Sequence, residues 1–226
     1  MDERVRHAGL LYEQAVFGGD ASLLDEADRE LDAAEAELAL ARGRILHTRF
    51  LLQRDHDPAS ATENPAELPF FERAAQRFHR LDDVSGEAEA LFWAGCFHQV
   101  VRRDNVAAVR LLQRSLELAT EAGEKATMAE ALRHLGIDAH FTGHPDVARR
   151  HLEESTRLRR EIGLMPGVAA NLVGLAYVAR AQGRRADIQP LLDEAAAIAD
   201  ASGAGRIAES VIEAREELAG QDGPPG

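Results

Sequence analysis

The chain has 226 residues, of which 45% are hydrophobic, and carries a formal net charge of -13 with one cysteine, Cys96. This acidic balance disfavours binding to nucleic acid or to anionic membranes, because both need a basic protein surface. A single cysteine excludes an intramolecular disulfide, and the start Met1-Asp2-Glu3 lacks the basic and apolar regions of a secretory signal. We therefore predict a cytoplasmic protein with neither a nucleic-acid nor a membrane partner.

A repeat of 40 residues runs through most of the chain. Apolar residues recur at this spacing, as do turn-type residues five positions later, at Leu38, Phe78, Leu118, Leu158 and Ile198 and at Gly43, Asp83, Gly123, Gly163 and Gly203. Alanine, leucine, glutamate and arginine dominate, and all four favour helices. A period of about 20 to 50 residues with helical patterning is typical of an α-solenoid. We therefore predict an all-α solenoid of about five helix-turn-helix repeats, forming one domain over residues 1–219.

The first repeat has an irregular start, as terminal repeats often do, and Ala27, Leu31, Ala34 and Leu38 mark its second helix. In the second repeat the first helix is interrupted at residues 55–58, which predicts a long loop. Its second helix is expected over residues 65–81, with Asn64 as N-cap and Glu67 as the reciprocal partner. Phe71, Ala74 and Phe78 form the predicted buried stripe of that helix.

The third, fourth and fifth repeats are the clearest. In the fourth, a helix is expected over about residues 126–142, Gly143 permits a turn, and Pro145 starts a second helix that ends near Gly163. The fifth repeats this pattern. In the third, matching Ala107 and Leu111 to the fourth repeat requires a shift of one residue between the two helices.

A last helix over residues 205–218 is expected to cap the final repeat, with Ile207, Val211, Ile212 and Leu218 pointing inward. Residues 220–226 are predicted to form a disordered tail.

The repeated positions resemble the tetratricopeptide repeat family, in its bacterial variety of about 40 residues. The family pattern has a large residue, leucine-glycine, a bulky residue, alanine, a large residue and alanine. The matching positions are Leu132, Leu135-Gly136, Ala139, Ala148, Leu152 and Ser155, two of which depart toward smaller or polar residues. Corresponding positions of the third repeat are Leu91, Ala94-Gly95, His98, Ala107, Leu111 and Arg114. The runs from Gly86 to Leu91 and from Ser115 to Ala119 resemble sensor regions of large actinobacterial transcriptional regulators. The sequence has no GxxxxGK[ST] loop and no basic recognition helix, so the resemblance implies an interaction module and not a complete regulator.

The resemblance also implies that the first helix of each repeat lines a concave, ligand-facing groove. The matching positions are Phe92, Cys96 and Gln99 in the third repeat, Arg133, Ile137, His140 and Phe141 in the fourth, and Val173, Tyr177 and Arg180 in the fifth. Two arginines and several aromatic rings suit a peptide or a small acidic ligand. The alternative interpretation is that these side chains only pack or solvate the inner helix surface.

Metal binding and catalysis have little support in the sequence. The pairs His134/Asp138 and His140/His144 have i, i+4 spacing, but two ligands do not specify a metal site. No GxSxG, HExxH or glycine-rich dinucleotide motif occurs. We predict no cofactor, no metal and no enzymatic activity. Under the alternative of an enzyme, Cys96 and His140 are the reactive candidates, whereas otherwise Cys96 is a small buried hydrophobe.

Three functional hypotheses follow. The first is a non-enzymatic module that binds a peptide or a partner-protein segment in its groove, and a regulatory role is one form of this hypothesis. The second is a small-molecule sensor that controls a separate regulator, with residues 55–64 closing a pocket, and the third is a biosynthetic enzyme built on this fold. A homodimer formed by stacking of chain ends is a further prediction.

Overall fold

The computed structural model describes residues 2–220, and these residues form ten α-helices, one π-helix and one 3-10 helix, without a β-strand. The prediction of an all-α repeat architecture is confirmed. The chain divides into two compact units, Met1–Ala122 and Gly123–Gly226. That all repeats form one continuous domain over residues 1–219 stays a prediction. Gly220 is the last residue of a helix, and the rest of the predicted tail, residues 221–226, lies outside the described residues.

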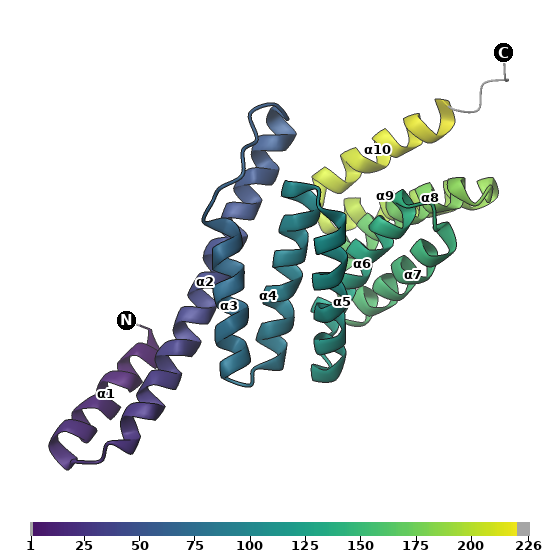
Figure 1. Cartoon of the computed structure of the whole chain (residues 1–226). Coiled ribbons are helices and arrows are strands. Elements are labelled where there is room, and N and C mark those ends of the chain that lie inside the picture. The colour runs from purple at the N-terminus through teal and green to yellow at the C-terminus, as the bar shows by residue number, and fades with distance from the viewer. Residues whose placement is uncertain (1, 221–226) are drawn as a thin grey trace. The chain divides into compact units, whose positions relative to one another are not determined.

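Unit one contains five α-helices, one of which belongs to two hairpins. They are α1 (Glu3–Gly18), α2 (Ser22–His56), α3 (Glu67–Arg80), α4 (Val84–Cys96) and α5 (Asn105–Ala122). Figure 1 shows α1 beside the N-terminal half of α2, and α3 beside its C-terminal half. The 35-residue α2 is therefore both the second helix of the first repeat and the first helix of the second repeat. The predicted long loop is confirmed between His56 and Glu67.

Gly43 does not mark a turn, although it shares the register of the turn residues. It lies inside α2, where a Cβ atom would overlap the ring of the fully buried Phe71. Glycine is needed at this position for close packing, whereas Gly123, Gly163 and Gly203 have positive φ angles of 70°, 73° and 65° at helix ends.

The start of α3 also differs from the prediction. The Asn64 side chain accepts a hydrogen bond from the Ala66 backbone at 3.0 Å, but α3 begins at Glu67. Glu67 does not reach back to Asn64. Its carboxylate is buried, and Oε1 lies 2.8 Å from Nδ1 of the buried His47. The predicted stripe of Phe71, Ala74 and Phe78 is buried as expected.

The third repeat contains an extra residue, which is accommodated by a π-helix over Phe97–Arg102. A π-helix adds one residue to a helical turn. Because the insertion falls before α5, the 40-residue register is already restored there. The buried positions of α5 are Ala108, Leu112 and Ser115, and the predicted Ala107, Leu111 and Arg114 are wrong by one residue.

Unit two contains the fourth and fifth repeats and a final helix. Its helices are α6 (Lys125–Phe141), α7 (Pro145–Glu161), α8 (Met165–Ala181), the 3-10 helix Arg185–Asp187, α9 (Ile188–Ser202) and α10 (Gly205–Gly220). Pro145 is at the start of α7 as predicted.

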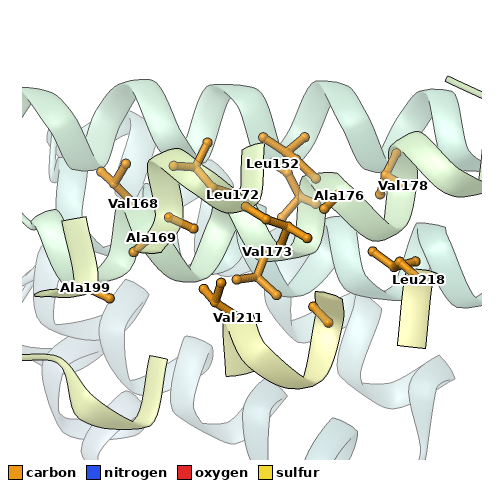
Figure 2. Close-up of a cluster of buried hydrophobic side chains, with 14 of the residues drawn as sticks. Leu152, Val168, Ala169, Leu172, Val173, Ala176, Val178, Ala199, Val211 and Leu218 are labelled. Carbon is orange, nitrogen blue, oxygen red and sulfur yellow. The ribbon is translucent and has the colours of Figure 1, made fainter. Parts of the chain in front are cut away.

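The core of unit two joins helices from consecutive repeats. Leu152 of α7 and Leu172 and Val173 of α8 pack with Val211 and Leu218 of α10 in one cluster, and Figure 2 shows these side chains. The expectation that Ile212 points inward is wrong, because it is 55% exposed and Ala214 is the buried residue of this turn. Within residues 2–220, no helix combines the length and apolar character needed to cross a membrane.

We predict opposite effects for alanine at two helical glycines of unit one. Gly43→Ala should lower the free energy of unfolding by about 1–3 kcal/mol, because the new methyl group displaces the buried Phe71 ring. Gly9→Ala should raise it by roughly 0.5–1 kcal/mol, because nothing lies within 4 Å of the added Cβ and alanine favours the helix. Urea unfolding measures both, and equal stabilities would contradict the assigned packing of Phe71.

Candidate functional site

Unit two has a groove of about 500 Å³ lined by α6, α8 and α10 and by Leu152 of α7. Helices α6 and α8 are the first helices of their repeats. Met165, the first residue of α8, lies 40 residues before Gly205, the first residue of α10, so α10 occupies the first-helix position of a sixth repeat. The groove is therefore formed mainly by the first helices of three consecutive repeats.

Six of the ten predicted ligand-facing residues line this groove, namely Arg133, Ile137, His140, Phe141, Val173 and Tyr177. Arg180 does not line it, and its Nη1 donates to the backbone oxygen of Leu218 at 3.1 Å. The remaining three, Phe92, Cys96 and Gln99, belong to unit one, where Phe92 and Cys96 are buried. The ligand-binding role of all ten residues stays a prediction.

Helix α10 also contributes to the groove, although its sequence pattern predicts only a cap. Ile207, Ser210 and Glu217 of this helix lie among the lining residues. The 40-residue repeat could have predicted this contribution, because Ser210 and Glu217 follow the groove residues Ala170 and Tyr177 by one period.

At one end of the groove, Arg133 is held in place by a chain of hydrogen bonds that runs from the partly buried guanidinium into the core. Its Nη1 donates to Ala170 O at 3.0 Å and to Asn171 Oδ1 at 2.9 Å. Asn171 Nδ2 then donates to Ser155 Oγ at 2.8 Å, and Ser155 Oγ donates to Ala129 O at 2.6 Å. The chain joins α6, α8 and α7. Arg133 is thus part of the packing as well as of the groove surface.

The group formed by Arg133, Arg159 and Glu130 carries a net positive charge. The Arg159 guanidinium lies close enough to affect Arg133, and it pairs with Glu130 at 2.7 Å. Among residues 2–220, Arg133 itself forms no ion pair. Burial, and secondarily the charge of Arg159, lowers the pKa of Arg133 to about 10, so it remains protonated at neutral pH. An anionic group placed at this end of the groove would be stabilised.

The other end of the groove is acidic. Tyr177 donates from its hydroxyl to Glu217 Oε2 at 2.9 Å. Burial, together with the neighbouring Glu217 carboxylate, raises the pKa of Tyr177 to about 12. Between the two ends the surface is largely apolar, with Ile137 and Val173 on the wall, and Phe141 is 79% exposed. The groove is therefore apolar along its length and oppositely charged at its ends.

Metal ligands do not gather in the described part of the chain, residues 2–220, where no group of three His, Cys, Asp or Glu side chains could hold an ion. The pairs His134/Asp138 and His140/His144 gain no third ligand there. Our expectation of a protein without a metal remains a prediction.

Residues 88–161 match the family model of the tetratricopeptide repeat, from within α4 to the end of α7. The solved structures that match include a crystal structure of nearly identical TPR-like repeats named for a kinesin light chain of Podosopora anserina. That structure is 16% identical, with 90% of this chain and 99% of that chain covered and a TM-score of 0.40. No curated protein matches the chain.

We predict that Asn171→Leu lowers the free energy of unfolding by about 1–3 kcal/mol, because Arg133 and Ser155 lose a buried partner. The matched control is Gln189→Leu, which removes an exposed amide that bonds Asp193 and should change stability by about 0.5 kcal/mol or less. Chemical denaturation of both variants tests this. If the two variants are equally stable, the buried chain does not fix Arg133.

Proposed function

We propose that this chain, which matches the tetratricopeptide repeat over residues 88–161, is a non-enzymatic module that binds a segment of a partner protein in the groove of unit two. Tetratricopeptide repeats generally mediate protein-protein interaction, and repeat proteins use concave surfaces for this purpose. A regulatory role, a cytoplasmic location and the exclusion of nucleic acid belong to the same proposal. The net charge of -13 supports the last of these.

The observation that carries the proposal is the fixed positive charge beside an apolar wall. Arg133 is oriented before a ligand arrives, so it loses little conformational freedom on binding. A partner segment with an acidic side chain would pair with Arg133 and bury apolar side chains against Ile137 and Val173. A basic side chain further along would face Glu217.

A small-molecule sensor is the second candidate, and the groove volume favours it. About 500 Å³ lies within the range of roughly 300–1,000 Å³ of sites that bind small molecules. The segment expected to close such a pocket, residues 55–64, belongs to unit one, where residues 62–65 line a separate pocket of about 210 Å³. A carboxylate on the small molecule would use the same arginine.

An enzymatic role has less support. Cys96, one of the two reactive candidates, is 1% exposed and agrees with the alternative of a small buried hydrophobe. Repeats of this family are generally non-enzymatic scaffolds.

The two candidates are separated by affinity capture on the wild-type chain and on Phe141→Ala, followed by mass spectrometry for proteins and for small molecules. Phe141 is largely exposed, so its loss should leave the fold intact and weaken groove binding by about tenfold. The matched control is Phe17→Ala, which removes a similarly exposed ring from unit one. A protein that is captured by the wild type and the control but lost with Phe141→Ala supports the proposal.

Binding of that protein should then be mapped with peptides from its sequence. We expect the tightest peptide to weaken by about tenfold when its acidic residue is replaced by the amide, since one charge-assisted contact to Arg133 is lost. Equal capture by all three forms of the chain would refute the groove. Release of a bound small molecule instead would favour the sensor.

A further inference from the structure

Five large apolar side chains of α2 are spaced by seven residues and lie on the surface. They are Leu24, Leu31, Leu38, Ile45 and Leu52, and each is between 39% and 55% exposed. Scattered apolar residues on a surface are common, but a regular strip on one helix marks an interaction site. The strip runs from Leu24 to Leu52, which is about 42 Å of helix.

A second strip of exposed apolar residues lies on α1. It consists of Val5, Tyr12 and Val16, which are between 40% and 59% exposed. These positions differ by seven and four residues, so they share one face of α1.

Both strips lie on the same side of the α1–α2 hairpin. Tyr12 of α1 directly follows Leu11, and Leu24 of α2 directly follows Leu23, where Leu11 and Leu23 belong to the cluster that joins the helices. In antiparallel helices, the residues that follow the contact positions point to the same side. The opposite side of the hairpin carries the ion pairs His7–Glu30 at 3.1 Å and Arg4–Glu37 at 2.6 Å, with one exposed apolar residue, Leu10, beside them. The hairpin therefore has one mainly apolar face and one mainly charged face.

The seven-residue spacing favours a helical partner. A strip with this period drifts by about 20° per repeat around a straight helix, so a partner helix follows it only by winding in a left-handed supercoil. The residues three positions beyond Leu31, Leu38 and Ile45 are small, at Ala34, Ala41 and Thr48. Small residues there let a second helix approach closely, as in a coiled coil.

The charges beside the strip favour a second copy of this chain, in antiparallel orientation. Asp28 and Glu35 lie four residues after Leu24 and Leu31, and Arg42 and Arg49 lie four residues after Leu38 and Ile45. The first half of the strip is thus bordered by acids and the second half by arginines. An antiparallel copy brings these unlike charges together on one side of the contact, whereas a parallel copy places them on opposite sides of it, where they cannot pair.

We propose that two copies of the chain form a homodimer through α2, antiparallel and centred on Leu38. Leu24 then faces Leu52 of the other copy, and Leu31 faces Ile45. Asp28 faces Arg49, and Glu35, which also pairs with Arg77 of α3, faces Arg42. The apolar strip of α1 covers the C-terminal half of the other α2, where Ile45 and Leu52 are exposed. The dimer uses unit one alone, so it is independent of the proposed groove.

Sedimentation equilibrium of the full chain tests the proposal. The wild type should sediment at twice the chain mass of 24.6 kDa. Leu38→Glu should weaken dimerisation by about a hundredfold or more, because it places two carboxylates together at the centre of an apolar interface. The control is Phe17→Glu, since Phe17 is 88% exposed but lies outside both strips, and it should leave the dimer unchanged. Circular dichroism checks that Leu38→Glu retains its helices.

A charge exchange tests the orientation. Asp28→Arg alone should weaken the dimer by several-fold, because it faces Arg49 of the other copy, and Asp28→Arg combined with Arg49→Asp should restore it. A parallel dimer would show no such rescue. Two results would overturn the proposal. One is a wild-type chain that remains monomeric at a concentration of about 100 µM, and the other is a dimer that survives Leu38→Glu.

Discussion

Close approach between each helix and its sequence neighbours is the constraint on which the structure depends. A repeat has no central core, so its helices must bury their apolar stripes against the next helix. Small residues make this possible. A Cβ on Gly95 would lie 2.9 Å from Leu112 Cγ, and one on Gly136 would lie 3.0 Å from Leu152 Cγ. Within each repeat, the glycine face of the first helix packs against the second helix. The opposite face of the first helix is therefore left to form a surface.

The 40-residue period was sufficient to predict the helix class, the repeats and most helix boundaries, because those depend on local patterns of apolar residues. It was insufficient where one residue type has two roles. Gly43 and Gly123 share a register, but Gly43 makes room for Phe71 inside a helix and Gly123 adopts a positive φ at a turn. The one-residue error in α5 has a similar origin, since a π-helix leaves no distinctive residue pattern.

The candidate site was predicted in part for a related reason. Groove positions such as Ile137 and Tyr177 follow from helical spacing, which places them on one face. The environment of Arg133 does not, because it depends on Asn171 from another helix and on Ser155 from a third. In sequence Ser155 is only a polar exception to the repeat pattern. In the structure it closes a hydrogen-bond chain, and Ser115 repeats its contact in unit one by donating to Ala88 O at 2.7 Å.

The continuity of α2 has a mechanical consequence. In most helical repeats a turn separates one hairpin from the next, and each turn is a point where adjacent hairpins can rotate. Here the backbone hydrogen bonds run unbroken from Ser22 to His56, so the first two hairpins share one stiff rod. A change in the orientation of the N-terminal half of α2 therefore also reorients its C-terminal half, up to the start of the loop at residue 57. The turn at which the first two hairpins could rotate against each other is therefore absent.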